Sequence, residues 1–279
     1  MRIRQPISLP WRVGLGAASV LLILLLYTWL AATRQSERRR ESGPEAQDLS
    51  APSWLMLYQD GLVRACTPQG RFKRKEIWIV SDFKATFGRL AAGLAGGVLV
   101  SVILGLLMGC YDPIDAFFLP PFSFVSKVPL VAVVPIFFLL VGVNFYTLFT
   151  MIFVAIVPTL AQAISQSVRK DVPEELIYKA HTLGASQFEL IWEVVFKQVL
   201  PRVLDAVRLN FGPALVLLVA TEWFVGGLDE GIGYRLRLFF QRTDMTVVYV
   251  YVFILGMIGL VTDYALIWLR RWLCPWFGD

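Results

Sequence analysis

The sequence contains one histidine, His181, and three cysteines, Cys66, Cys110 and Cys274. The cysteines are far apart and form no CxxC pair, so neither a disulfide framework nor a cysteine metal site is expected. A single histidine leaves almost nothing from which to build a histidine metal site or a Ser–His triad. We therefore expect no catalytic centre, no metal and no cofactor in this chain.

Charge is also scarce. Only 17% of the 279 residues are charged, 57% are hydrophobic, and the mean hydropathy is +0.63. Soluble domains are about 45–50% apolar, so this composition indicates an all-α integral membrane protein with several spans. The net charge of +5 comes from basic residues that flank apolar segments, as expected beside anionic lipid headgroups. No nucleic-acid partner is expected.

A nucleotide-binding loop is missing too, because GxxxxGK[ST] occurs nowhere. The segment GRFKRK at 70–75 lacks the second glycine and the Lys-Ser/Thr end. The chain therefore is not expected to be an enzyme, and any ATP hydrolysis would be carried out by another polypeptide.

What the chain does contain is a series of long uncharged runs, which predict six spans. The run of 41 residues from Val128 to Val168 is twice what a bilayer core of about 30 Å requires, so we divide it at Gly142–Asn144. The first span exceeds the usual apolar core of a signal peptide, so a retained helix is favoured. The predicted spans are 13–33, 90–111, 128–141, 146–166, 207–225 and 245–269.

The remaining segments complete the expected organisation. Residues 112–126 are predicted to be a proline-bearing connection and 226–244 a loop, while 53–66 could form a short amphipathic helix on the membrane. We expect an N-terminal transmembrane helix over 1–33, a polar extramembrane linker over 34–84, a transmembrane domain over 85–272 and a tail over 273–279.

Small residues and prolines mark two of the spans. The second span carries two GxxxG pairs, which share one helix face and favour close packing. They are Gly93 with Gly97 and Gly105 with Gly109. The third span carries Pro129 and Pro135, which indicate either a pore-lining element or an ordinary kink.

Two charged side chains lie near span ends. Glu222 is either a gate or packing residue or an interfacial one, because a carboxylate at span depth usually faces a pore or a partner. Arg89 is interpreted as a headgroup anchor, with an anion ligand as the alternative.

A polar, helix-patterned island, Asp171–Arg208, separates two apolar stretches. Asp171 and Glu174 fit a capping box, and Gly184 is predicted to end the helix before a second one starts at Ala185-Ser186. An apolar stripe at helical spacing is formed by Val172, Leu176, Ala180 and Leu183. The pattern fits either a connector lying on the headgroups or a docking helix.

The island resembles the cytoplasmic loop of ABC importer permeases, the inner membrane components of binding-protein-dependent transport systems. Ala180 and Gly184 keep that family's Ala-xxx-Gly spacing, and Leu200-Pro201 matches a later Leu-Pro. Tyr178 replaces the family's glutamate and Lys179 its first alanine. Further similar blocks are Lys127–Val143, Ala206–Trp223, Gly227–Leu236 and the basic C-terminal ending, in the nitrate, sulfonate and taurine branch with its MetI-like domain.

The resemblance implies a multi-pass protein of the bacterial inner membrane, with a five-helix core plus the N-terminal span. It implies a pair of permeases around a path for a small solute, such as the anions nitrate, sulfonate or taurine. A dimeric ATPase and a periplasmic or extracellular solute-binding protein would be its partners, and the 172–184 helix would couple to the ATPase. The expected coupling residues are Glu174, Glu175, Leu176, Lys179, Ala180, His181, Leu183, Gly184 and Ala185.

Two other classes of protein are disfavoured by the sequence. A secondary, ion-coupled transporter tends to show mid-membrane acidic residues and inverted repeats, and the central parts of the first four spans carry no charge. A membrane enzyme would need a cluster of nucleophiles or metal ligands, which a single histidine disfavours.

Overall fold

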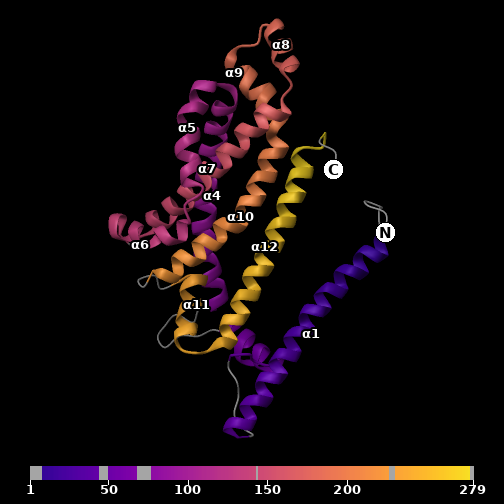
Figure 1. Ribbon diagram of the computed structural model, residues 1–279, viewed down its shortest axis with the longest axis vertical. Coiled ribbons are helices and arrows are strands. Elements are labelled where there is room, and N and C mark those ends of the chain that lie inside the picture. Colours follow the sequence, from indigo (N-terminus) through magenta and orange to yellow (C-terminus); the bar gives the residue numbers. More distant parts are fainter. Residues whose placement is uncertain (1–7, 44–49, 68–76, 143, 226–229, 277–279) are drawn as a thin grey trace. The chain divides into compact units, whose positions relative to one another are not determined.

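The structure is a computed structural model, and it describes residues 8–43, 50–67, 77–142, 144–225 and 230–276. Every regular element in these ranges is a helix (Figure 1), which confirms the expected all-α class. The chain divides into two compact units, Met1–Thr67 with Phe239–Tyr251 and Pro68–Leu238 with Val252–Asp279. The basic segment 70–75 lies outside the described residues.

The first unit is built on one long helix, α1 (Leu9–Ser42), which continues nine residues beyond the predicted end of the first span at Thr33. The predicted amphipathic segment is helical, as α2 (Trp54–Met56), the π-helical η1 (Leu57–Val63) and α3 (Arg64–Cys66). Residues 34–84 therefore hold the end of α1, these short helices and the first residues of the next long helix.

Hydrogen bonds and close packing hold the first unit together. The Tyr27 hydroxyl donates to the carbonyl of Pro52 over 2.7 Å, and the guanidinium of Arg64 lies 2.6 Å from Asp244. Gly61 packs so closely that a Cβ there would lie 2.9 Å from the carbonyl oxygen of Thr246. Glycine thus lets this short helix approach the backbone of the last long helix.

The second unit contains the other helices. In chain order they are α4 (Trp78–Cys110), α5 (Asp112–Val125), α6 (Leu130–Val141), α7 (Phe145–Asp171), α8 (Glu174–Thr182), α9 (Gln187–Glu189), the π-helical η2 (Leu190–Phe196), α10 (Lys197–Phe224), α11 (Ile232–Gln241) and α12 (Met245–Leu273). Residues Phe239–Tyr251 belong to the first unit. They comprise the end of α11, the turn that follows it and the start of α12.

The core of the second unit is the contact between α4 and α7. The four predicted glycines face α7, and Cβ atoms added at Gly105 and Gly109 would lie 2.7 Å from Ile164 and 2.5 Å from Val168. Gly93 faces Ile152 and Gly97 faces Ile156. Ser101 is buried between the two glycine pairs, so every fourth residue of α4 from Gly93 to Gly109 is small. This spacing keeps the small residues on one helix face, so the two backbones come close together.

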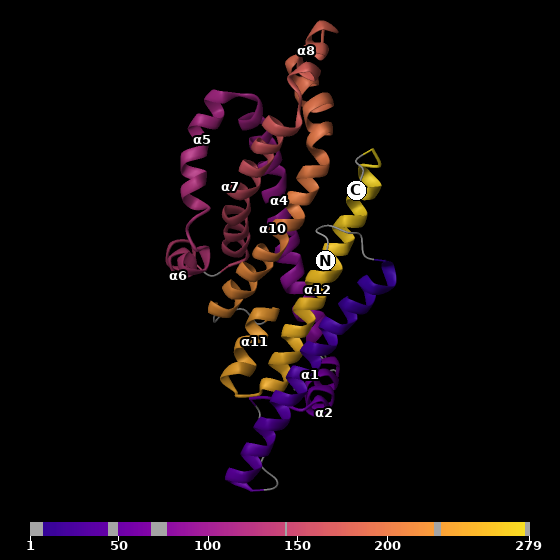
Figure 2. The same cartoon turned by 45° about the vertical axis from the view of Figure 1, so that its right-hand side comes forward.

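The span prediction needs correction in the middle of the chain. Within the described ranges, five helices are long and apolar enough to span a bilayer. The helices α5 and α6 form a pair bent by 97°, which makes a sixth span if the pair is counted as one. Residues 128–141 are therefore not a span by themselves. The predicted connection at 112–126 is the helix α5, which tolerates Pro120 and Pro121 in its interior (Figure 2).

Polar contacts fasten α5 to α7. Ser123 and Ser126 bond to Gln162, and Arg169 lies 2.9 Å from Asp112. The predicted loop at 226–244 also needs correction, because it contains α11. That helix begins directly after Gly231, whose φ of +139° favours glycine.

Candidate functional site

One end of the second unit is formed by α8 and the turn that follows it (Figure 1). Glu174 and Glu175 lie in the first turn of α8, and Lys179 and His181 in the last, which suits the helix dipole at both ends. Ala180 is buried against the main core, so α8 is attached to the unit by one face only.

The turn after α8 is closed by backbone hydrogen bonds. The amide of Gly184 donates to the carbonyl of His181 over 3.0 Å, and the amide of Ala185 to that of Ala180 over 3.1 Å. Gly184 has a φ of +83°, a left-handed conformation that costs other L-residues energy. The predicted role of glycine as a helix end at this position is thus explained by geometry.

The start of α8 differs from the prediction. Asp171 is the last residue of α7 and pairs with Arg202 over 3.3 Å, and Pro173 stands at the N-cap without a side-chain cap. The capping box lies instead at the next helix start, where Ser186 and Glu189 bond reciprocally.

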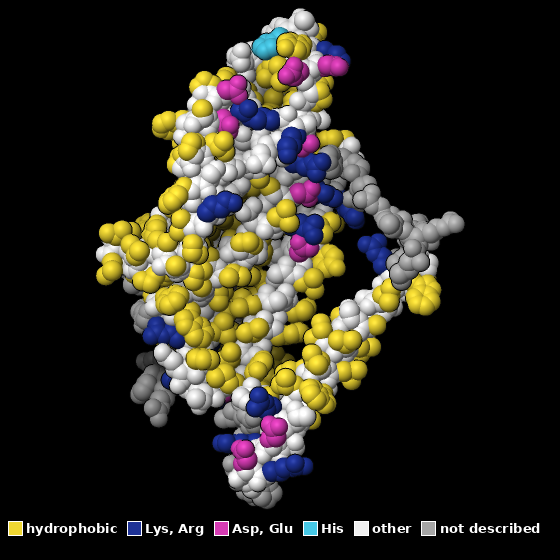
Figure 3. All heavy atoms as spheres, viewed as in Figure 1, with side chains coloured by type: hydrophobic (Ala, Val, Ile, Leu, Met, Phe, Trp, Pro, Cys, Tyr) yellow, Lys and Arg dark blue, Asp and Glu magenta, His cyan; other side chains and the backbone are white. Residues whose placement is uncertain are grey.

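The apolar stripe of α8 is also only partly buried. Val172 and Ala180 are buried, but Leu183 is 87% exposed. With Tyr178 and Phe188 it forms a set of exposed apolar side chains that we call the tip surface, together with the charged residues of α8. Figure 3 shows the histidine beside apolar and acidic atoms at this tip.

The opposite end of α10 holds a buried polar network that the sequence did not predict. Glu222 is fully buried and accepts hydrogen bonds from Thr86 Oγ1 (2.9 Å), an Arg89 guanidinium nitrogen (2.7 Å) and the amide of Gly233 (3.0 Å). Arg89 also donates to the carbonyl of Glu230. Arg89 is therefore an internal partner and not the predicted headgroup anchor.

A second ion pair extends this network. Fully buried Asp82 accepts two hydrogen bonds from Arg235, at 2.7 and 3.1 Å, and one from the amide of Gly231. The Arg235 guanidinium also lies 4.9 Å from the ring centre of Trp78. The network therefore joins α4, α10 and the start of α11 through hydrogen bonds to the carboxylates of Glu222 and Asp82.

The buried network explains why glycine is required in the Gly-Ile-Gly motif, Gly231–Gly233. A Cβ on Gly233 would lie 2.2 Å from the carbonyl oxygen of Val219, so only glycine lets the start of α11 reach Glu222. The amide of Ile232 meanwhile donates to Thr86 Oγ1. Residues 227–229 of the predicted motif lie outside the described part of the chain.

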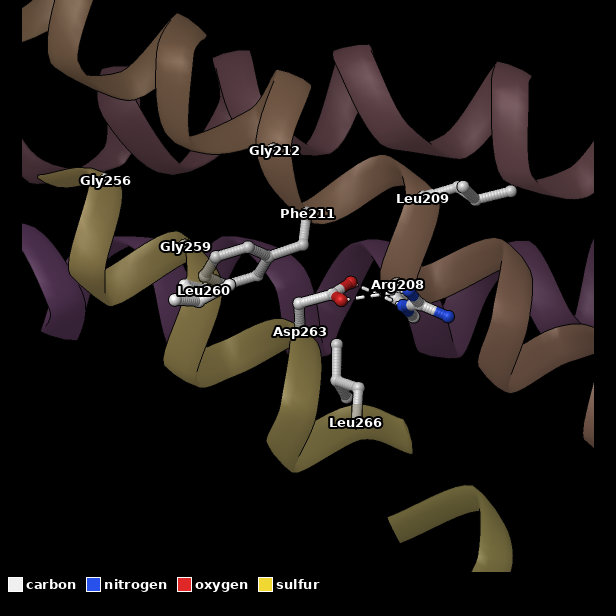
Figure 4. A pocket seen from close by; sticks show the side chains of 9 residues that line it. All are labelled: Arg208, Leu209, Phe211, Gly212, Gly256, Gly259, Leu260, Asp263 and Leu266. Carbon is white, nitrogen blue, oxygen red and sulfur yellow. Dashed lines mark hydrogen bonds and ion pairs between the residues drawn. The ribbon is translucent and has the colours of Figure 1, made fainter. Parts of the chain in front are cut away.

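A groove of about 440 Å³ lies between α10 and α12, and an ion pair lines it. Figure 4 shows Arg208 and Asp263 pointing toward each other across it, with Arg208 Nη2 2.9 Å from Asp263 Oδ2. Arg270 of α12 pairs in turn with Asp205 of α10 over 2.9 Å. Each of the two helices contributes one acid and one base.

The two predicted pore prolines belong to α6. Pro129 is its N-cap and Pro135 lies in its interior. A cavity of about 270 Å³ between α6, α7 and α10 is lined by Leu130 and Val131, which come between the two prolines.

Comparisons with known proteins agree with this architecture. The family model for binding-protein-dependent transport system inner membrane components matches residues 97–278. The taurine transport system permease protein TauC of Escherichia coli (strain K12) is 26% identical over 282 residues, covering 100% of this chain and 94% of TauC. The bicarbonate transport system permease protein CmpB of Synechococcus elongatus is 25% identical over 189 residues, covering 68% of this chain and 67% of CmpB.

A solved structure of the methionine ABC transporter MetNI, in an inward facing conformation, matches the fold. Its TM-score is 0.54 at 15% sequence identity, and the match covers 70% of this chain and 97% of that chain. At this identity the likeness shows the fold alone. Because the family model spans more than half of the sequence, this multi-pass chain belongs to the inner membrane components of binding-protein-dependent transport systems, the permeases of ABC importers.

Proposed function

We propose that this chain forms the translocation path of an ATP-driven importer and takes its motion from a separate ATPase through α8. The observation that carries the proposal is the tip surface. Tyr178, Leu183 and Phe188 are exposed there beside charged side chains, at the end of a helix held to the core by Ala180. Apolar groups exposed together on a polar projection favour a protein partner.

The attachment of α8 supports a lever role. Val172 and Ala180 are buried in the same core cluster as the α4–α7 contact, and Asp171 pairs with Arg202 of α10. A pull on α8 would therefore act on α7 and α10 together. ATP binding would shift the populations of inward-open and outward-open states, because the closed ATPase pair would bind one of them better.

The solute and the other partners are inferred from the relatives. TauC is named for taurine and CmpB for bicarbonate, so a small anion-bearing solute is favoured. A separate binding protein would deliver this solute to the outer side, where the Glu222 network would lie if α8 faces the cytoplasm. Two copies of this chain, as in a homodimer, would surround the path.

A secondary transporter is the less favoured alternative. An ion-coupled carrier needs a carboxylate free to bind its ion. Glu222 of α10 and Asp263 of α12 are each paired with an arginine. The pairing favours a structural use of both charges.

Co-purification tests the coupling role. The chain is expressed with the ATPase of a neighbouring reading frame and isolated from detergent by an affinity tag. Leu183→Asp is expected to lower ATPase recovery at least fivefold, since it places a charge in the tip surface. The matched control is Gln198→Asp, which introduces the same charge at an exposed residue in the first turn of α10. This variant is expected to retain the ATPase. Equal recovery with both variants would refute docking at α8.

A further inference from the structure

The cavity of about 270 Å³ between α6, α7 and α10 contains two polar side chains, Thr159 of α7 and Asn210 of α10. Its other described lining residues are apolar, and none carries a charge. Thr159 and Asn210 both lie inside uncharged runs of the sequence. Polar side chains at such depth face the interior of the bundle or a water-filled cavity.

The hydrogen bonds between Thr159 and Asn210 do not use all the donors and acceptors of the Asn210 amide. The single hydroxyl hydrogen of Thr159 is within reach of Asn210 Oδ1 at 2.9 Å and of the carbonyl of Ile156 at 3.0 Å. Asn210 Nδ2 donates to the carbonyl of Ala206 over 2.8 Å. A primary amide has two N–H donors and two acceptor positions on its oxygen. One donor and one acceptor of Asn210 thus remain for another molecule.

Each of the three helices that border the cavity has a proline in its interior. They are Pro135 in α6, Pro158 in α7 and Pro213 in α10. A proline removes the hydrogen bond to the carbonyl four residues earlier, and inside a membrane this is tolerated where the freed carbonyl faces protein or a cavity with water. Pro213 itself lines the cavity, and Val131, whose carbonyl Pro135 frees, does so too.

We propose that Asn210 and Thr159 form a transit site, where a small solute with a sulfonate or carboxylate group touches the wall of the path. The inference rests on the proposed function. The free N–H of Asn210 would donate to an oxygen of the solute, with the hydroxyl of Thr159 holding the amide in place. Since none of the described residues that line the cavity is a cation, the contact is weak and lets the solute leave, as conduction requires.

Cysteine labelling tests whether the cavity carries water. Cys66, Cys110 and Cys274 are replaced by serine, and single cysteines are introduced as Asn210→Cys or Thr159→Cys in membranes that contain the co-expressed ATPase. The probe is sulfonatoethyl methanethiosulfonate, a small anion that does not cross lipid, added to both faces. Leu99→Cys, exposed on α4 outside the cavity, is the low-reactivity control. Gln198→Cys, exposed in the first turn of α10 and outside the tip surface, is the water-exposed control.

Both cavity cysteines are expected to react at least tenfold faster than Leu99→Cys. Rates equal to that of Leu99→Cys would overturn the proposal, because the pair would then be an ordinary interhelical hydrogen bond in a dry bundle.

Charge preference tests the role of the amide. With Thr159→Cys as reporter, the rate with the sulfonate reagent is divided by the rate with its trimethylammonium counterpart. In the Asn210→Leu background this ratio is expected to fall about threefold to tenfold, the equivalent of one hydrogen bond, and Asn210→Gln should retain it. An unchanged ratio in Asn210→Leu would overturn the assignment of Asn210 as the donor.

These outcomes are separable from those for the proposed function. Labelled cavity cysteines without ATPase recovery would keep the path and reject the ATP-driven coupling. ATPase recovery with unreactive cavity cysteines would keep the coupling and reject the transit site.

Discussion

The two ends of α10 differ in their surroundings, with α8 near one end and α11 near the other (Figure 2). At its C-terminal end, Glu222 and Asp82 are fully buried, and the hydrogen-bond partners described for them, Arg89 and Arg235 among them, come from the same unit. At the other end, α8 buries Ala180 and leaves Tyr178 and Leu183 exposed. One end is satisfied internally, and the other presents its side chains outward.

The difference assigns separate tasks to the two ends. A buried network of two ion pairs is costly to break, because removing one partner leaves an uncompensated charge. It therefore fixes α4, α10 and the start of α11 relative to one another. An exposed helix held by one face can be moved by a partner at less cost. Substitutions at the two ends should consequently separate stability from coupling.

The largest effect is expected from Glu222→Ala, which removes the only described acceptor of the Gly233 amide and leaves the buried Arg89 guanidinium without its carboxylate partner. Breaking a buried pair costs about 3–5 kcal/mol, so we expect a large fall in the thermal unfolding temperature of the purified chain in detergent. Glu193→Ala, which removes an exposed pair with Lys197, is the control and should cost at most about 1 kcal/mol. Similar shifts for both would contradict the anchoring role of Glu222.

The next largest effect concerns the α4–α7 contact. Gly109→Leu would force the two helices apart, because even a Cβ there would lie 2.5 Å from Val168. Overpacking of this kind costs about 1–3 kcal/mol or more. Gly88→Ala, where a Cβ would meet nothing within 4 Å, should be neutral or slightly stabilising. If both variants melted at the same temperature, the close contact would not be important for stability.

The sequence predicted the features that depend on local pattern. The glycines of α4 are spaced by helix geometry, and Gly184 follows a short amphipathic helix, so both could be read from the chain. The pairs Arg89–Glu222 and Asp82–Arg235 join residues 133 and 153 positions apart, and no local pattern links them. Prolines misled the prediction for 112–126, because Pro120 and Pro121 suggested a break where α5 continues.

A smaller effect is expected in the turn after α8. Gly184→Val places a β-branched residue at a φ of +83°, where a left-handed conformation costs about 1–2 kcal/mol. Because the turn is exposed, the chain should still fold and insert, while ATPase recovery declines. Gly184→Asn, which tolerates this conformation better, should preserve recovery. Loss with both variants would mean that the turn requires more than a left-handed residue.

The smallest effect is expected at the ion pair between α10 and α12. Arg208 and Asp263 are partly exposed, and exposed pairs contribute little in water. We expect Asp263→Asn to change the melting temperature by less than about 2 °C in detergent. A large shift would indicate that the groove is closed to solvent in the assembled protein.

Uphill accumulation of solute in proteoliposomes tests the central claim most directly. Vesicles containing this chain, the ATPase and the binding protein are predicted to concentrate a labelled solute of that binding protein when ATP is supplied, and to lose this ability with Leu183→Asp. In vesicles with this chain alone, the solute is predicted to reach at most equal concentrations on the two sides of the membrane. Accumulation against the gradient by the chain alone would contradict the account.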